Sequence, residues 1–485
     1  MIVLVRIASE VSLKSVAVKK RFVDRLIGNL REAVKAVSTK CKVRNEWSRL
    51  FVEVDDLNAV NQLSRVFGVA SISPVEHICP SDMDSMRKTI EKYKPAVKGK
   101  KYCVRARRSG VKGFVSKDVE KILGGILWND ALKVDLKNPD IRIDVHIRPD
   151  GAYFFSEKIP GPGGFPLGVQ GKALCMISGG FDSAVAAWML MKRGLALDFV
   201  FCNLAGDAYE KDTLGVTKAL IDQWCFGYEP TFHSLDFGKI VDEIKNDTEP
   251  RYNQVVLKRL MYKASAMVAS DVKHCMALVT GEAMGQVSSQ TLDNLAVINA
   301  ATEMPVLRPL IGFEKEEIIE RSRKIGTYYM SEKVKEYCAL TSKKPVTKGK
   351  LPIAEEQEKK LTPGILEAAV EGRHILDLKQ LDLASLMGDK VFTDQVPENA
   401  KVVDCRSKEM FRDWHYPNAE HKDLDHLLNQ YTDLNDQDVW VFYCPWGLQT
   451  AVLAERMQSA GYKAFSFRGG TQAIRKYAVS IGVDW

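Results

Sequence analysis

The segment that most constrains the fold is Ser-Gly-Gly-Phe-Asp-Ser at residues 178–183, because it stands between an apolar run and a helical pattern. Residues 174–177 are typical of a buried strand, and residues 184–192 are predicted to form a helix. Backbone N–H groups at such a turn, together with the partial positive charge of a helix N-terminus, bind anions. The serines add hydroxyl donors, and the glycines let oxygen atoms approach the backbone closely. The segment therefore predicts a phosphate-binding loop, with a serine-capped glycine turn as the alternative.

The pattern of elements indicates several domains in the 485 residues. After a segment rich in Gly and Pro, short apolar strands near residues 198–202 and 276–280 alternate with helical segments, which favours a parallel α/β sheet. Smaller α+β patterns precede it, and a Lys-, Glu- and Pro-rich segment that is predicted to be a solvated linker, or a linker leading into a helix, follows it. We predict domains at residues 1–57, 58–160, 172–342 and 389–485, with connections at 161–171 and 343–388.

The basic residues are concentrated near the start of the chain. The first 50 residues contain twelve Lys or Arg against four Asp or Glu, whereas the whole chain has a formal net charge of +7. Such a local excess suggests an anionic partner, and a solvated basic surface without a ligand is the alternative.

The lengths of the apolar stretches and the spacing of the cysteines indicate the cellular compartment in which the protein is expected. No apolar stretch approaches the roughly 18 residues needed to span a bilayer, so no membrane association is expected. The ten cysteines form no Cys-x-x-Cys pair and have no histidine at zinc spacing. We therefore expect reduced thiols, a cytoplasmic protein and no structural metal.

The 178–183 segment resembles the pyrophosphate loop (PP-loop) of enzymes that cleave ATP to AMP and pyrophosphate while adenylating a substrate oxygen. Three other segments narrow this resemblance: Gly-Glu-Ala-Met-Gly-Gln-Val-Ser-Ser-Gln-Thr-Leu at 281–292, Arg-Pro-Leu-Ile-Gly-Phe-Glu-Lys-Glu-Glu-Ile at 308–318, and Glu-Tyr-Cys at 336–338. Together they resemble the ThiI family, which makes 4-thiouridine in transfer RNA.

The resemblance extends over essentially the whole chain. It implies a multidomain α+β and α/β fold: a ferredoxin-like domain and a THUMP domain that bind tRNA, an α/β PP-loop domain, and an α/β rhodanese-like domain. The last resembles the segments Val-Val-Asp-Cys-Arg at 402–406 and Val-Phe-Tyr-Cys-Pro-Trp-Gly-Leu-Gln-Thr at 441–450. Residues expected to bind RNA are Lys14, Arg105, Arg107, Arg108 and Lys112.

The resemblance also implies an ATP site, with Mg²⁺ bound together with the ATP. The residues expected to contact ATP are Met176, Ile177, Ser178, Gly179, Gly180, Ser183, Lys258, Gly281 and Gln290. Asp182 and Lys315 match acid and base positions that activate the uridine, and Asp182 would also help to organise Mg²⁺. As alternatives, both lysines could be exposed helix residues and Gln290 a helix cap or surface residue.

Two cysteines are candidates for the sulfur chemistry. Cys444 ends a predicted strand before a loop and a helix, where N–H groups and the helix dipole would hold a persulfide; the alternative is a core cysteine. The resemblance implies that Cys338 attacks or resolves this persulfide and leaves a disulfide; the alternative is an isolated exposed cysteine. Trp446 and Ala451 stand where related loops commonly have arginine. A less cationic loop would hold a small anionic donor such as thiosulfate poorly, so we expect a partner protein, a cysteine desulfurase, to deliver the sulfur.

The predicted reaction is ATP-dependent transfer of persulfide sulfur to C4 of a tRNA uridine. Alternatives are thiolation at another uridine position, amidation of a small acid, a non-catalytic RNA-binding protein, and a persulfide carrier that serves thiazole synthesis for thiamin without ATP. The carrier role is also associated with the family, so a sulfur-carrier protein is a further candidate partner. The sequence leaves a homodimer open.

Overall fold

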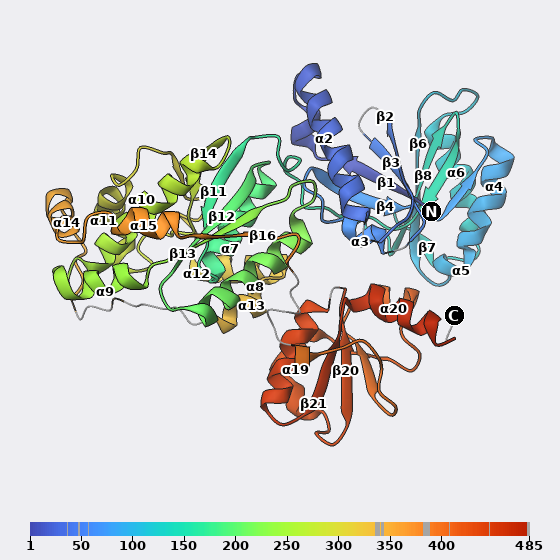
Figure 1. Ribbon diagram of the computed structural model, residues 1–485. Coiled ribbons are helices and arrows are strands. Elements are labelled where there is room, and N and C mark those ends of the chain that lie inside the picture. The colour runs from blue at the N-terminus through green and yellow to red at the C-terminus, as the bar shows by residue number, and fades with distance from the viewer. Residues whose placement is uncertain are drawn as a thin grey trace. The chain divides into compact units, whose positions relative to one another are not determined.

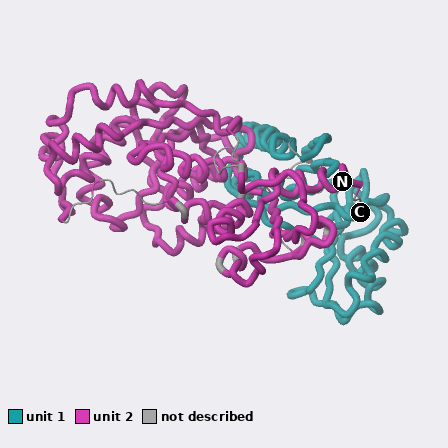
Figure 2. Tube along the Cα trace, turned by 60° about the horizontal axis from the view of Figure 1, so that its bottom comes forward, with its two compact units in different colours: residues 1–166 teal, residues 167–485 magenta. Residues whose placement is uncertain are grey.

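The computed structural model describes residues 1–35, 37–46, 49–56, 58–334, 340, 344–381, 389–406, 408–445 and 447–482. The chain divides into two compact units, Met1–Pro166 and Leu167–Trp485 (Figure 2). This division falls inside residues 161–171, where the sequence predicts a connection. Each unit is described by itself below.

The first sheet of unit 1 is antiparallel, in the order β10 (Ile159–Pro160), β4 (Val69–Pro74), β1 (Ile2–Ile7), β3 (Arg49–Val54), β2 (Cys41–Glu46). Its helices are α1 (Ser9–Ser12), α2 (Val16–Val34) and α3 (Ala59–Leu63). In α2, Phe22, Leu26 and Leu30 are buried, as the helical spacing of apolar residues predicts. Because β4 pairs with β1, this sheet continues past residue 57, where we placed the end of the first domain.

The second sheet of unit 1 has the order β5 (His77–Cys79), β9 (Gly151–Phe155), β8 (Ile141–Arg148), β6 (Lys101–Arg108), β7 (Lys133–Val134). The helices are α4 (Met83–Ile90), η1 (Glu91–Tyr93), α5 (Lys94–Val97) and α6 (Ser116–Leu127). Ile143, Val145 and Ile147 of β8 enter a core with α4 and α6. Because side chains alternate along a strand, Arg142, Asp144 and His146 therefore lie on the opposite face.

The two sheets of unit 1 meet through aromatic side chains. Phe51 of β3 lies 5.1 Å from Tyr153 of β9, measured between ring centroids. Leu4 and Phe155 complete this buried cluster. The packing explains why both predicted N-terminal domains belong to one compact unit.

The first sheet of unit 2 has the order β15 (Val306–Leu307), β14 (Cys275–Val279), β11 (Lys172–Met176), β12 (Ala196–Asn203), β13 (Thr231–Asp236), β16 (His374–Asp377). Strands β11 to β15 pair in parallel, as predicted. The edge strand β16 pairs antiparallel with β13. The strand therefore comes from the segment that we predicted as a connection at 343–388.

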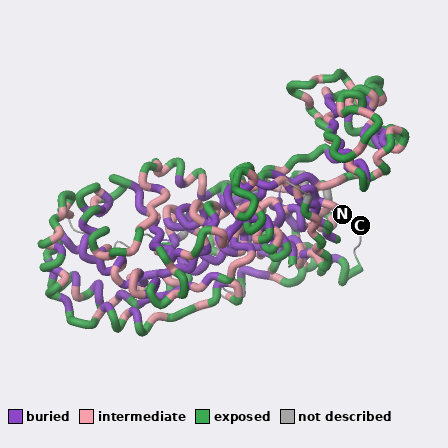
Figure 3. Tube along the Cα trace, turned by 90° about the horizontal axis from the view of Figure 1, so that it is seen from above, coloured by how far each residue is buried: buried purple, intermediate pink, exposed green. Residues whose placement is uncertain are grey.

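Helices cover both faces of this sheet (Figure 1). One group contains α7 (Phe181–Lys192), α8 (Asp207–Trp224), α12 (Lys315–Ile325) and α13 (Tyr328–Lys333). The other contains α9 (Gly238–Asp247), α10 (Asn253–Asp271), α11 (Leu292–Asn299), α14 (Leu351–Glu358) and α15 (Ile365–Glu371). All eight residues of β12 are buried, including the polar Asp198 and Asn203, as expected for a central parallel strand that is covered on both faces. Figure 3 shows the burial of the residues along the chain.

The last domain has a parallel sheet in the order β17 (Phe392–Thr393), β21 (Lys463–Phe467), β20 (Val439–Tyr443), β18 (Lys401–Asp404), β19 (Glu420–His421). Its helices are η3 (Asp389–Val391), α17 (Lys408–Asp413), α18 (Leu424–Gln430), η4 (Tyr431–Asp433), α19 (Leu448–Ser459) and α20 (Gly470–Ser480). Alternate residues of β20 enter separate apolar clusters on the two faces of the sheet, so this domain also has three layers.

Of the two alternatives for residues near 343–360, a solvated linker or a linker leading into a helix, the structure supports the second, because the segment leads into α14, which is packed against α10. Arg259 of α10 is 1% exposed and pairs with Glu358 of α14. Arg259 also donates to the carbonyl oxygen of Val297 at 2.6 Å, and Lys263 lies 2.5 Å from the same glutamate. The charged residues that suggested a solvated linker thus include the acid that neutralises a buried cation.

Replacing Glu358 by Ala should destabilise unit 2, because the buried Arg259 cation loses its closest counter-charge. Breaking a buried pair in this way costs about 3 to 5 kcal/mol. The measurement is the midpoint of thermal unfolding. Glu356→Ala, at an exposed position of the same helix, is the matched control. Equal midpoints for the two variants would show that the ion pair does not hold α14 in place.

Candidate functional site

The predicted phosphate loop lies between β11 and α7. Helix α7 begins at Phe181, three residues earlier than predicted, so Asp182 and Ser183 belong to its first turn. The backbone N–H of Ser178 donates to Ser183 Oγ at 3.2 Å. The hydroxyl of Tyr209 donates to the carbonyl oxygen of Ser178 at 3.2 Å. These bonds fix the loop at the carboxyl end of a buried strand, where α/β sheets bind ligands.

Gly281 brings a second loop against the first. A Cβ atom at this position would lie 2.6 Å from the carbonyl carbon of Asp182 and from the nitrogen of Ser183. Only glycine allows this approach, because both neighbouring atoms belong to the backbone. The loops that follow β11 and β14 are therefore in direct contact.

These loops border a cavity of about 540 Å³. The predicted site residues that line it are Met176, Ile177, Ser178, Gly180, Asp182, Ser183, Lys258, Gly281 and Gln290. Gly179 belongs to the same loop, with φ +74°. The cavity is within the size range of small-molecule sites in proteins. The predicted ATP residues, which come from residues 176–183, Lys258, Gly281 and Gln290, are thus brought to one place.

The wall of the cavity contains a buried hydrogen-bond acceptor that has no partner among the described residues. Gln290, in η2 (Ser288–Gln290), is 9% exposed, and its Oε1 is buried without a hydrogen-bond partner among the described residues. A buried unsatisfied amide oxygen is costly unless a ligand donates to it. The amino group of adenine is a donor of this kind, so the cavity fits a nucleotide.

Asp182 and Lys315 form an ion pair at the edge of the cavity. Lys315 Nζ donates to Asp182 Oδ1 at 2.8 Å, and the two side chains are 34% and 21% exposed. The ammonium group also lies 5.6 Å from the centroid of the Phe181 ring, which stacks on Tyr328 at 5.3 Å. The second oxygen of Asp182 accepts from Gln286 Nε2 at 2.9 Å. Both ends of the carboxylate are therefore fixed.

A buried polar network forms another wall, and we did not predict it from the sequence. Glu282 accepts hydrogen bonds from Tyr262 at 2.5 Å and from Arg308 Nε at 2.9 Å. Thr280 donates to the same carboxylate at 3.1 Å. Burial, and then the nearby carboxylate, raise the pKa of the Tyr262 hydroxyl, which stays a neutral donor. Because Glu282 follows Gly281 in the chain, these hydrogen bonds also fix the position of Gly281.

Cys444 follows β20 and precedes the loop to α19. It is 1% exposed, and Thr450 Oγ1 donates to its sulfur at 3.5 Å. The N–H of Thr471 donates to the carbonyl oxygen of Cys444 at 3.0 Å. At Gly470, an added Cβ would lie 2.4 Å from that oxygen, so glycine is required there as well. Ala451, predicted to replace a common arginine, is fully buried in α19.

Two of the predicted sulfur-site positions, Cys338 and Trp446, lie outside the described residues. Val334 and Leu340, the nearest described residues on either side of Cys338, both line the cavity beside the phosphate loop. The predicted roles of Cys338 and Cys444 stay predictions.

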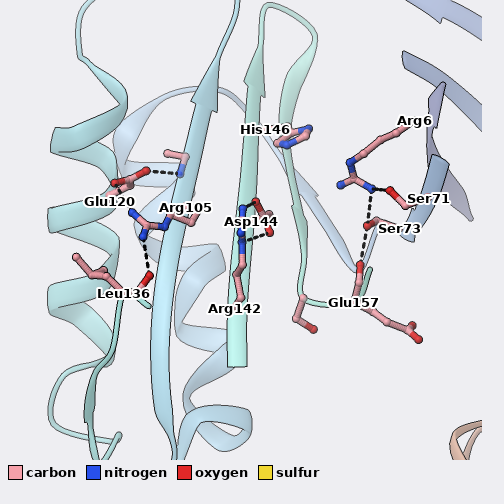
Figure 4. A network of polar contacts seen from close by, with 12 residues as sticks. Arg6, Ser71, Ser73, Arg105, Glu120, Leu136, Arg142, Asp144, His146 and Glu157 are labelled. Carbon is pink, nitrogen blue, oxygen red and sulfur yellow. Dashed lines mark hydrogen bonds and ion pairs between the residues drawn. The ribbon is translucent and has the colours of Figure 1, made fainter. Parts of the chain in front are cut away.

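The predicted RNA-binding residues belong to unit 1, and several are engaged within it. Arg105 donates to the carbonyl oxygen of Leu136 at 2.9 Å and pairs with Glu120 at 3.9 Å (Figure 4). Arg108 donates to the carbonyl oxygen of Val111. Lys14 Nζ lies 4.9 Å from the ring centroid of Phe165. Arg107 and Lys112 are exposed and form no hydrogen bond or ion pair with a described residue, so their charges are available to a polyanion.

Further arginines gather around His146 between the two sheets of unit 1. Arg49 donates to His146 Nδ1 at 2.7 Å. Figure 4 shows His146 and the nearby Arg6, which donates to Ser73 Oγ at 3.0 Å. Burial and the surrounding arginines, Arg49 first, lower the pKa of His146 to about 3. The imidazole is therefore a neutral acceptor at physiological pH. Sequence reasoning missed this cluster because its members are distant in the chain.

The described residues contain no group of three or more His, Cys, Asp or Glu side chains placed to hold a metal ion. No helix among them combines the length and apolar character needed to cross a membrane.

Replacing Gly281 by Ala should weaken nucleotide binding by at least about tenfold, because the added methyl group forces the two loops apart. The dissociation constant for ATP is the quantity to measure. Gly285→Ala in the same loop is an imperfect control, since its positive φ of 76° adds strain although no atom blocks the methyl group. If Gly281→Ala bound ATP as tightly as wild type, the contact between the two loops would not be needed for nucleotide binding.

His146 should make folding sensitive to acid. Its pKa of about 3 in the folded protein lies below the ordinary value of 6.5, so the unfolded chain binds a proton that the folded protein does not. Stability should be lost as the pH falls below 6.5, at up to about 1.4 kcal/mol per unit. Unfolding midpoints of wild type and His146→Gln, which keeps an acceptor for Arg49, should diverge between pH 6.5 and 4.5. Parallel curves would contradict this assignment.

Four family profiles match the chain in sequence order. They are described as the ThiI ferredoxin-like domain at residues 2–73, the THUMP domain at 81–157, thiamine biosynthesis protein (ThiI) at 168–362, and the rhodanese-like domain at 387–477. These matches confirm the predicted fold class and the order of the four domains.

A solved structure that matches is a 4-thiouridine synthetase in complex with RNA and bound ATP. The two share 26% identity with a TM-score of 0.69, over 78% of this chain and 99% of the other. A protein from Pyrococcus horikoshii, 24% identical with a TM-score of 0.53, covers 67% of this chain and 99% of its own, and shows the fold alone.

Relatives that match along the whole chain are named tRNA sulfurtransferase. The protein of Desulfurococcus amylolyticus is 35% identical over 97% of this chain and 98% of its own length. The protein of Pyrobaculum aerophilum is 36% identical over 92% of this chain and 93% of its own length. The protein of Shewanella sediminis is 35% identical over 95% of this chain and 98% of its own length. At this identity and coverage, the chain belongs to the ThiI family of tRNA sulfurtransferase enzymes.

Proposed function

We propose that this enzyme uses ATP to transfer persulfide sulfur to a tRNA uridine, forming 4-thiouridine through an adenylated intermediate. The observation that carries the proposal is the cavity that joins the phosphate loop to the Asp182–Lys315 pair. The relatives named tRNA sulfurtransferase and the RNA- and ATP-bound 4-thiouridine synthetase support it. The reaction is a substitution at C4 in which sulfur replaces oxygen, so the oxygen must first be converted into a leaving group.

Adenylation supplies the leaving group. The N–H groups of the phosphate loop and the positive charge of Lys258 would hold the ATP phosphates. When the uridine O4 attacks the α-phosphorus, the bond to pyrophosphate breaks and the N3 proton of the ring passes to solvent. Lys315 lies beside Asp182, where charge develops in this step. Asp182 and Glu282 are the carboxylates among the lining residues, and the buried network occupies Glu282. Asp182 is therefore the residue that would face an ATP-bound Mg²⁺.

The sulfur would be carried on Cys444 as a persulfide. The Cys338 thiolate attacks Cys444 Sγ, which forms a Cys338–Cys444 disulfide and releases hydrosulfide. Hydrosulfide adds to the adenylated C4, and AMP leaves with the former O4. Direct attack by the terminal persulfide sulfur is the alternative route. Because Cys444 is 1% exposed, either route requires the loop between β20 and α19 to open.

We propose a cysteine desulfurase as sulfur donor, because Ala451, in the first turns of α19, supplies no cation beside Cys444 to attract a small anionic donor such as thiosulfate. We also propose that the reaction takes place in the cytoplasm, where tRNA, ATP and such donors are found. The exposed Arg107 and Lys112 favour binding of the tRNA backbone by unit 1. A homodimer is compatible with this assignment.

The name of the profile at residues 168–362, thiamine biosynthesis protein, favours a second role as a sulfur donor to thiazole synthesis. That role needs the Cys444 persulfide and a sulfur-carrier protein as acceptor, without adenylation of tRNA. The two roles therefore share Cys444 and differ in their need for Asp182.

The test is nucleoside mass spectrometry of unmodified tRNA incubated with the protein, Mg-ATP, cysteine and a cysteine desulfurase. Asp182→Asn and Cys444→Ser should each lower 4-thiouridine formation at least about 100-fold, because one disrupts activation and the other removes the sulfur carrier. Cys79→Ser, in unit 1, should remain within about twofold of wild type.

The results separate the candidate functions. Persulfide on the protein with loss of thiolation in Asp182→Asn would support the two-step reaction. Full thiolation by Asp182→Asn would rule out the assigned role of the PP-loop. ATP turnover without any 4-thiouridine in the wild type would point to a different acceptor.

A further inference from the structure

Gln286 lies in the loop between β14 and η2, at the edge of the cavity. Its side chain lines the cavity, and the residue is exposed. We propose that Gln286 recognises the acceptor base, by accepting a hydrogen bond from N3–H of uracil and placing O4 beside the Asp182–Lys315 pair. This inference rests on the proposed function and adds the residue that selects the base.

The orientation of the Gln286 amide follows from its partner. A carboxylate accepts hydrogen bonds and cannot donate them, so the group that faces Asp182 Oδ2 at 2.9 Å is the amide nitrogen. The oxygen of the same planar amide is then directed away from Asp182. It forms no hydrogen bond with a described residue. Gln286 thus presents one acceptor and its remaining N–H at the edge of the cavity.

This pair of groups matches uracil and not cytosine. Uracil has a donor at N3 next to the acceptor O4, so an amide can bond both atoms with its oxygen and its nitrogen. Cytosine has an acceptor at N3, which would face the amide oxygen of Gln286, another acceptor. Its amino group at C4 is a donor, which would face the amide N–H, another donor. An unpaired or repelled polar group costs more than a missing contact.

Two other glutamines line the cavity, and their amide groups are used differently. Gln254 accepts a hydrogen bond from Ser288 at 3.1 Å and donates to the carbonyl oxygen of Leu340 at 3.4 Å. Gln290 is buried, with its free oxygen in the part that fits the nucleotide. Gln286 is therefore the lining glutamine whose acceptor is open to a base arriving from solvent.

The position of Gln286 relative to the ion pair supports recognition at the reacting edge. Asp182 accepts from Lys315 through one oxygen and from Gln286 through the other. A base bonded to Gln286 by its N3–C4 edge is thereby held next to both charged groups. The phosphate loop adjoins the same carboxylate through Ser183, so ATP and the base would meet there.

The test combines a change in the protein with a change in the base. The dissociation constants of wild type and Gln286→Ala are compared for tRNA that carries uridine or its analogue cytidine at the acceptor position. We expect the wild type to bind the cytidine tRNA about tenfold more weakly than the uridine tRNA. Gln286→Ala should bind the two tRNAs within about twofold of each other, because the amide that distinguishes their N3–C4 edges is absent.

Met284→Ala is the matched control, since Met284 is 52% exposed in the same loop. It should retain the tenfold discrimination. Gln286→Ala should bind ATP as tightly as wild type, which checks that the cavity is intact.

An equal loss with the analogue in wild type and Gln286→Ala would overturn the inference, because it would mean that Gln286 only positions Asp182 or has no role. Failure of the wild type to thiolate the uridine tRNA at all would instead reject the proposed function, and the inference with it. Loss of discrimination confined to Gln286→Ala would establish the contact with N3–H.

Discussion

The contact of Gly281 with the backbone of Asp182 and Ser183 is the constraint on which the rest of the PP-loop site depends. It joins the carboxyl ends of β11 and β14, which lie side by side in the sheet. One loop supplies the phosphate-binding groups and the other supplies Gln286 and Gln290. Because the two backbones touch, a shift in either strand would move nucleotide and acceptor groups relative to each other. The buried Glu282 network next to Gly281 limits such shifts.

The sequence predicted the parts of this site that are local. The phosphate loop is a short motif between a strand and a helix, so its residues could be named before the structure was known. The strands β4 and β16 could not be assigned to their sheets in the same way, because their pairing depends on partners far along the chain. Similarly, Tyr262, Glu282 and Arg308 meet only after folding, and nothing in their separate neighbourhoods indicates the network.

The arginine cluster and the buried ion pair show the same limit in another form. Charge counting indicated a basic N-terminal segment, but it could not distinguish Lys20, which remains exposed, from Arg49, which donates to a buried histidine. It also suggested a solvated linker where Glu358 neutralises Arg259. Composition records how many charges a segment has, and burial decides whether a charge binds a ligand or stabilises the fold.

The sulfur chemistry makes demands on Cys444 that oppose one another. A persulfide must be kept from solvent, and the 1% exposure of Cys444 serves that purpose. The same sulfur must later be reached by another thiol. At Cys444 the backbone is held by hydrogen bonds from Thr471 and by the glycine contact at Gly470. Protection and transfer can therefore alternate through a local opening of the loop between β20 and α19, while the strands of the last domain stay in place.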